Sequence, residues 1–151
     1  MGGGFLFLKT LHVLSAIVAV GANVTYALWM ARGERDPAHL GFALRGIKLL
    51  DDRVANPAYG VLLITGVIMA VTQYSITLTW TLTGLVVFLV VAALATGVFS
   101  PALTRQLKAL DAEGASSPAY QRARATVMGV GLFMTVLVVA VVFVMVFKPQ
   151  L

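Results

Sequence analysis

The chain has 151 residues, of which 60% are hydrophobic and 11% are charged. Soluble domains average about 45–50% apolar and about 25% charged residues, so this composition excludes soluble and disordered proteins and predicts a single integral membrane domain over residues 1–151. The net charge is +5, and most of the basic residues lie in the connections between apolar segments, so we expect a lipid bilayer and not nucleic acid as the partner. The absence of cysteine excludes disulfides and thiolate metal sites.

The first apolar segment, residues 5–31, predicts a transmembrane helix. At 1.5 Å per residue it is about 40 Å long, which exceeds the hydrocarbon core of a bilayer. Residues 1–4 carry no basic side chain and the apolar run is too long for a secretory signal, so we expect this helix to be retained. Lys9 and His12 lie near its start, and Arg32 follows its end.

The connection of residues 32–54 has the pattern of an amphipathic helix. Asp36 is a good N-cap and the proline after it suits the first helical position. We expect a helix over residues 37–54 that lies parallel to the membrane plane, with Arg45, Lys48 and Asp52 toward water. Its apolar face repeats at steps of three and four residues, at Leu40, Ala43, Leu44, Ile47 and Leu50.

Three further apolar segments predict spans at about residues 56–76, 78–99 and 124–147. Asn56 followed by Pro57 is typical of a helix start and places the beginning of the second span there. The predicted fold is therefore all-α, a transmembrane four-helix bundle with a surface amphipathic helix between the first and second spans.

The later connections differ in charge and length. Residues 73–79 carry no charge and predict a tight antiparallel hairpin between the second and third spans. The third span ends at Ser100 and Pro101, and residues 112–118 predict the turn before the fourth span. Ser117 with Pro118 restarts a helix, and Lys148 with Pro149 closes the fourth span. Beyond the third span, its helix is prolonged by Leu103, Leu107 and Leu110.

The distribution of basic residues predicts the orientation of the chain. Nine of the eleven lysines and arginines lie in residues 32–54 and 101–124, which four spans place on one side of the membrane. The positive-inside rule then puts both segments in the cytoplasm and both termini on the periplasmic side of a bacterial cytoplasmic membrane.

Acidic residues inside a span would point to proton transport or to a metal site. None of the six acids lies within a predicted span, so we expect each to balance a nearby basic residue. This distribution argues against proton-driven transport through a buried carboxylate. The acids are Glu34, Asp36, Asp51, Asp52, Asp111 and Glu113.

His12 is an ionisable residue that does lie inside a predicted span, about two turns into the first one. An imidazole in a membrane helix either forms a hydrogen bond with a neighbouring helix or binds a ligand, and neutral histidine is a common axial ligand of haem iron. Lys9 lies one turn earlier on the same face, where it could meet a haem propionate. The other histidine, His39, lies in the basic connection and is expected to be solvated, so two axial histidines are not expected.

Other polar residues of the spans have structural explanations. Asn23, Thr25 and Tyr26 form a polar patch, in which Asn23 either joins two helices, the more frequent use, or lines a path. Thr65 is expected to bond to its own helix backbone. Small residues mark helix contacts, either inside the bundle or in a dimer: Ser15, Ala19, Ala22, Gly66, Ala70, Ala93, Gly97 and Gly129.

Several short motifs along the chain carry a family resemblance. They are Leu-Lys-Thr-Leu-His-Val-Leu at residues 8–14, Asn-Pro-Ala-Tyr-Gly at 56–60, Thr65 with Gly66, Trp80, and Met-Val-Phe-Lys-Pro at 145–149. The sequence resembles a group of small bacterial four-helix membrane proteins described as predicted integral membrane proteins of unknown function.

The same frame is similar, more distantly, to HemJ-type protoporphyrinogen oxidases and to the membrane domain of copper-resistance D-type proteins. In the oxidases a first-helix histidine binds haem b, and His12 matches that position. They also carry a lysine on the third helix a few residues after a tryptophan, where this chain has Gly84 after Trp80. The resemblance thus implies haem b on His12, with Lys9 near a propionate, but argues against oxidase activity.

Three hypotheses for function remain open. The first is a haem-associated membrane protein with His12 as axial ligand. The alternative is a non-catalytic accessory or scaffold subunit, which packs against a larger membrane complex or a second copy of the chain and has no cofactor. The third is a transporter component with Asn23 along its path, which the absence of acids from the spans disfavours.

Overall fold

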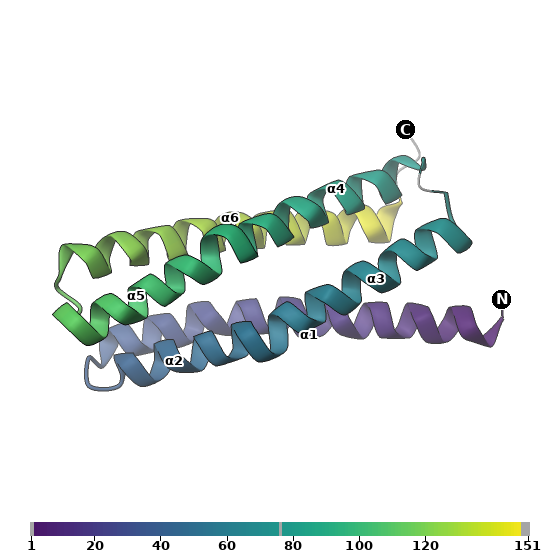
Figure 1. Cartoon of the computed structure of the whole chain (residues 1–151). Helices are drawn as coiled ribbons and strands as arrows, with labels where there is room; N and C mark the ends of the chain where they lie inside the picture. Colours follow the sequence, from purple (N-terminus) through teal and green to yellow (C-terminus); the bar gives the residue numbers. More distant parts are fainter. Residues whose placement is uncertain (1, 76, 149–151) are drawn as a thin grey trace.

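The computed structural model describes residues 2–75 and 77–148, and these contain helices but no strands. Four helical stretches are long and apolar enough to cross a membrane, which confirms the predicted all-α fold class. They run up and down the bundle, so that the N-terminal end of the first and the C-terminal end of the last lie at the same end (Figure 1). Pro149 and residue 76, the expected end of the second span, lie outside the described residues.

The first helix, α1 (Gly3–Arg35), contributes a stripe of mostly small buried residues to the bundle. Ser15, Ala19 and Ala22 are all at most 9% exposed, so the small residues of this helix serve packing within the chain. In membranes, helix association depends on such close approach, since lipid tails are as apolar as the helices. By contrast, Ala93, Gly97 and Gly129 lie on the exterior of the bundle.

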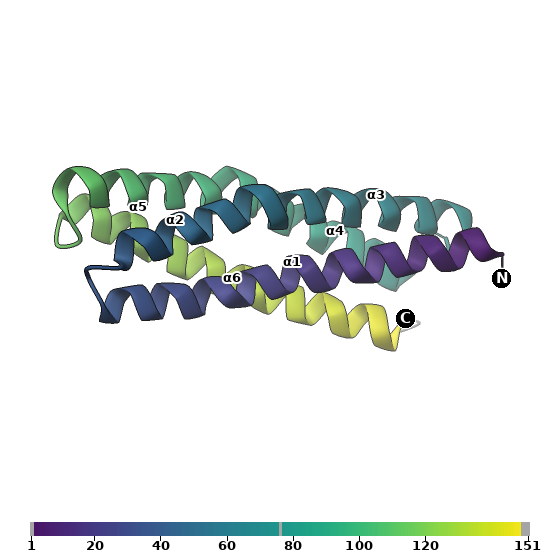
Figure 2. The same ribbon diagram turned by 90° about the horizontal axis from the view of Figure 1, so that it is seen from below.

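The second stretch is one continuous helix made of α2 (Leu40–Leu50), the π-helix η1 (Asp51–Ala55) and α3 (Asn56–Thr72). The predicted apolar face of α2 is confirmed, because Leu40, Ala43, Leu44 and Ile47 are all buried. The predicted orientation of this segment is wrong. The segment is not a separate helix parallel to the membrane plane but continues directly into the second span, as Figure 2 shows.

The third stretch repeats this construction, with α4 (Thr79–Leu94), the π-helix η2 (Ala95–Phe99) and α5 (Ser100–Glu113). Both π-helices come directly before an X-Pro pair, Asn56-Pro57 or Ser100-Pro101. A proline inside an α-helix removes one backbone hydrogen bond and crowds the preceding turn, and a π-turn is one way for a helix to accommodate this defect. Both pairs are therefore internal to long helices. The helix start predicted at Asn56-Pro57 is wrong, whereas α5 confirms that the third helix is prolonged beyond Ser100-Pro101.

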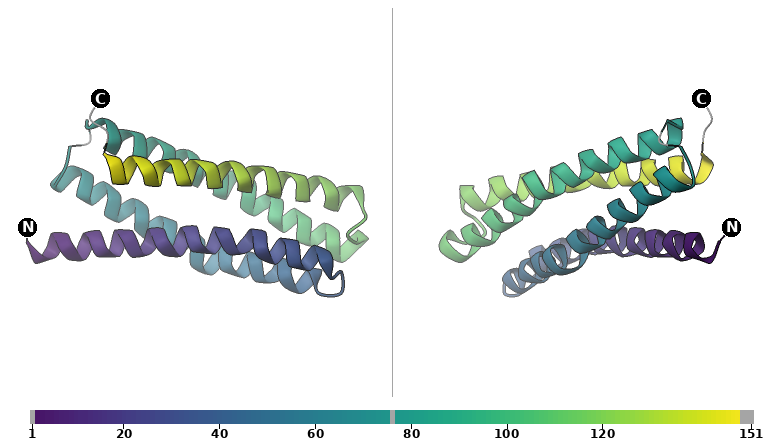
Figure 3. Two further views of the ribbon diagram at one scale, coloured as in Figure 1. Left: turned by 180° about the vertical axis from the view of Figure 1, so that it is seen from behind. Right: turned by 45° about the vertical axis from the view of Figure 1, so that its right-hand side comes forward.

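A short turn around Gly114, whose φ of +84° suits glycine, leads into α6 (Pro118–Phe147). The Ser117 hydroxyl caps α6 by accepting a hydrogen bond from the Tyr120 N–H at 3.2 Å. The predicted helix start at Ser117-Pro118 is confirmed, and it lies six residues before the expected beginning of the fourth span at 124. As a result, α5 and α6 extend side by side with α1 and α2 at the end of the bundle opposite the termini (Figures 1 and 3).

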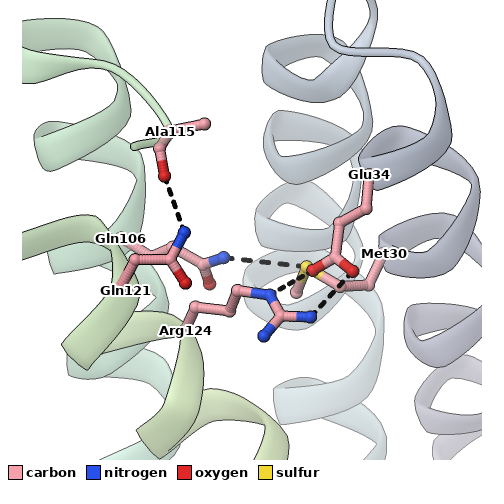
Figure 4. Close-up of polar contacts among 6 residues, drawn as sticks. All are labelled: Met30, Glu34, Gln106, Ala115, Gln121 and Arg124. Carbon is pink, nitrogen blue, oxygen red and sulfur yellow. Dashed lines mark hydrogen bonds and ion pairs between the residues drawn. The ribbon is translucent and has the colours of Figure 1, made fainter. Parts of the chain in front are cut away.

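At this opposite end, polar contacts join α1 to α5 and α6 (Figure 4). Arg124 of α6 donates two hydrogen bonds to the Glu34 carboxylate of α1, one of them at 2.8 Å. The fully buried Gln106 of α5 donates to the Met30 sulfur at 3.7 Å. These contacts, together with the buried Leu44 and Leu103, close this end of the bundle.

Candidate ligand cavity and buried polar cluster

The other end of the bundle, where the termini lie, contains a cavity of about 660 Å³. Its walls come from α1, α3, α4 and α6 and are almost entirely apolar. Binding sites for small molecules and cofactors are typically about 300–1,000 Å³ and mostly apolar, with few polar groups. This cavity therefore has the size and lining of a site for a lipophilic ligand.

His12 is part of the cavity wall. Its Nδ1 lies 2.9 Å from the Thr65 hydroxyl of α3, and that hydroxyl lies 2.7 Å from the Val61 carbonyl oxygen. Because the hydroxyl donates its one proton to this carbonyl, it accepts the hydrogen bond from His12 Nδ1–H. In this tautomer Nε2 carries the lone pair. Thr65 thus bonds to its own backbone, as expected, and also orients the imidazole.

Gly66 of α3 supplies the space that the imidazole ring occupies. A Cβ atom at this position would lie 3.0 Å from His12 Cε1 and 3.5 Å from Nδ1. The 3.0 Å contact is tighter than ordinary packing, so the ring would have to shift by a few tenths of an ångström. The neighbouring residues Thr65 and Gly66 therefore fix the position of His12, one by a hydrogen bond and the other by the absence of a side chain.

The two lysines near the termini occupy different positions relative to the cavity. Lys9 is exposed and is not part of the described wall, so its predicted role beside a propionate stays a prediction. The ammonium group of Lys148 lies 5.1 Å from the ring centroids of both Tyr74 and Trp80, and both rings line the cavity. The sequence indicated Lys148 only as the end of the fourth span, whereas the structure puts its cation beside the cavity wall.

Gly84 of α4 does not provide open space for a ligand. A Cβ atom there would lie 1.8 Å from the Met145 methyl carbon, so the Met145 side chain of α6 occupies the position that a larger residue would need. Gly84 is buried and still contributes to the cavity wall, but it mainly allows α4 and α6 to approach closely. A lysine at this position would require Met145 to move.

A polar cluster lies on the interior side of this cavity. Asn23 of α1 donates a hydrogen bond to the Tyr59 hydroxyl of α3, which confirms that Asn23 joins two helices. The Tyr59 ring packs edge-to-face on Phe88 of the cavity wall, with the ring centroids 6.1 Å apart. Tyr26 stacks on Phe99 with a centroid distance of 6.1 Å, and its buried hydroxyl has no hydrogen-bond partner among the described residues.

Asp51 belongs to the same cluster and was not predicted as a site. It is the first residue of η1 and is only 3% exposed, so the expectation that every acid lies outside the bundle interior is wrong. The sequence does contain a signal for this position. Asp51 comes four residues after Ile47 and seven after Leu44, and the helical repeat therefore places it on the buried face.

The comparison with protein families gives one result. A family model described as predicted integral membrane protein (DUF2269) matches residues 6–149. The chain belongs to this family. No curated protein and no solved structure matched the chain. Membership in the DUF2269 family establishes an integral membrane protein, and the more distant similarity to the oxidases and copper proteins stays a prediction.

Proposed function

We propose that this DUF2269 protein binds a lipophilic ligand in the cavity between its four helices, and that haem b on His12 is the ligand that the cavity suits best. The observation that supports this proposal is the combination of a large apolar space with one imidazole in its wall. Thr65 accepts the hydrogen bond from Nδ1 of this imidazole, so the lone pair that would bind a metal is on Nε2. A hydrogen bond of this kind, which fixes the tautomer of a ligating histidine, is common in metal sites.

The residues present fit haem b in three respects. His12 would be the axial ligand, the apolar wall would surround the macrocycle, and Lys148 would meet a propionate at the end that holds the termini. The second histidine cannot take part, since His39 lies in the turn before α2 at the opposite end of the bundle, bonded to Asp36 at 2.7 Å. When bound, haem b would supply one-electron redox chemistry or bind a small molecule at its other axial position.

Protoporphyrinogen oxidation is not part of this proposal. The oxidases that the sequence resembles distantly carry a lysine on the third helix, and the corresponding Gly84 is covered here by Met145. The helix α4, residues 79–94, contains no basic residue that could take the place of that lysine. We therefore expect binding without oxidase activity.

The proposal predicts that haem binding depends on His12. Titration of the purified wild-type protein with ferric haem b should give a shifted, saturable Soret band at one haem per chain. His12→Ala should remove this shift, because the iron loses its axial ligand. The matched control is His39→Ala, which removes the exposed histidine and should leave the titration unchanged.

The outcome also separates the proposal from its alternative. If wild-type protein and His12→Ala give the same spectrum, the cavity does not hold haem through His12. The accessory or scaffold hypothesis, in which the exterior of the bundle binds a larger complex or a second copy, would then be the better explanation. A change in His39→Ala alone would also contradict the proposed site.

The location in a bacterial cytoplasmic membrane, with both termini in the periplasm, is likewise part of the proposal. Its support is that both basic segments lie at the end of the bundle opposite the termini. Alkaline phosphatase fused after Leu151 should be active, and the same enzyme inserted at the Gly114 turn should be inactive. The reverse pattern would contradict this orientation.

A further inference from the structure

Asp51 is the only acid among the described residues that is buried, with 3% of its surface exposed. Its Oδ2 atom has no hydrogen-bond partner in the described part of the chain. An ionised carboxylate in the interior of a membrane bundle is costly unless a positive charge neutralises it. The identity of that positive charge decides what this site does.

We propose that Asp51 binds a proton and forms a proton-binding site in the middle of the bundle, distinct from the ligand cavity. This inference does not rest on haem binding. The carboxyl group is neutral when it carries the proton and becomes charged when the proton leaves. Membrane carboxylates that can exchange protons in this way are typical of pumps, transporters and redox proteins.

The charged and titratable groups around Asp51 support a proton as the neutralising charge. Lys48 of α2 is the nearest cation, but its ammonium group bonds to Asp52 and lies 3.1 Å from the Ser100 hydroxyl. Lys48 therefore pairs directly with Asp52 and acts on Asp51 only at longer range, so Asp51 has no ion-pair partner of its own among the described residues. Tyr26 of α1 and Tyr59 of α3, the other titratable groups within electrostatic range, are neutral at physiological pH.

The oxygen atoms near Asp51 suit a proton better than a metal cation. The Ser100 hydroxyl lies within hydrogen-bonding reach of the carboxyl group, and the Tyr26 hydroxyl lies in its electrostatic range. Hard metal cations generally take about six or more oxygen ligands, and the ammonium group of Lys48 would repel one here. A protonated carboxyl group instead needs only one acceptor. Tyr26 is 5% exposed, and its buried hydroxyl, like Asp51 Oδ2, has no hydrogen-bond partner in the described structure.

The position of the site in the fold also distinguishes it from a chance buried acid. Asp51 begins the π-helix η1, and Ser100 directly follows the π-helix η2. Irregular π-turns of this kind are frequent at functional sites. On the other side of the cluster, the Tyr59–Asn23 pair reaches Phe88 in the cavity wall. The proton-binding site therefore lies between the basic end of the bundle and the cavity, and the objection to the transporter hypothesis no longer holds.

Infrared spectroscopy of the full chain in lipid vesicles tests this proposal directly. Wild-type protein at neutral pH should show the C=O stretching band of a protonated carboxylic acid, with the small downward shift in D₂O that an exchangeable proton causes. Asp51→Asn should remove the band. The matched control is Asp52→Asn, which removes the neighbouring, exposed acid and should retain it.

Several results would contradict the proposal. Absence of the band from wild-type protein would overturn it, as would loss of the band in Asp52→Asn. Loss of the wild-type band on addition of sodium chloride, but not of choline chloride, would identify a sodium site instead. If Asp51→Asn fails to fold, Asp51→Glu gives the answer: a displaced band supports the proposal, and an unchanged band shows that another carboxyl group is its source.

Discussion

Gly66→Ala should weaken the binding of haem b by about 10- to 100-fold, the range found for residues that orient a metal ligand. The added methyl group would lie 3.0 Å from His12 Cε1 and 3.5 Å from Nδ1. The ring must therefore move away from α3, which lengthens the 2.9 Å contact between Nδ1 and Thr65. The substitution keeps the histidine and changes only its position, so it tests the geometry of the site and not merely the presence of a histidine.

The same helix offers a matched control for this experiment. A methyl group added at Gly60 would meet no atom within 4 Å, so Gly60→Ala adds the same group to α3 without touching the imidazole. Haem titrations of both variants, followed by their Soret bands, should show a loss of affinity for Gly66→Ala alone. Equal affinities in the two variants would show that the position of the His12 ring does not control binding.

Much of the fold could be predicted from the sequence because a bilayer imposes strong constraints on it. Runs of about 20 apolar residues predict spans, and the basic residues indicate which connections share an end. The prediction failed at Asn56-Pro57, where proline was taken to mark a helix start, but it correctly expected the third helix to continue beyond Ser100-Pro101. Both pairs are favourable at a helix start, but a π-helix before each lets one helix continue. Sequence patterns for helix starts do not distinguish these two structures.

The candidate site was predictable only in part. His12 could be identified because ionisable residues are rare in membrane helices. Its partner Thr65 and the space at Gly66 could not, since they depend on which faces of α1 and α3 meet. Asp51 was missed for a related reason. The expected break before Asn56 placed it in a surface connection, whereas the continuous helix carries it into the interior.

Because the apolar face of α2 is buried inside the bundle, a substitution there should give the largest change in stability. Leu44→Ala should lower the free energy of unfolding by about 2–5 kcal/mol, the range for removing a buried leucine side chain. Leu44 is 0% exposed and belongs to the core that α2 forms with α1 and α5. Thermal or denaturant unfolding of the full chain in detergent micelles would measure the difference.

Leu49→Ala is the matched control, since Leu49 lies on the same helix and is 60% exposed. Its replacement should change the free energy of unfolding by no more than about 0.5 kcal/mol, as for other surface positions. The comparison separates the two arrangements of this segment. A helix lying on the membrane would direct Leu44 toward lipid, and both variants would then unfold like the wild-type protein. In the continuous helix, Leu44 instead fills space between helices that no lipid can reach, and only its loss leaves a cavity in the bundle.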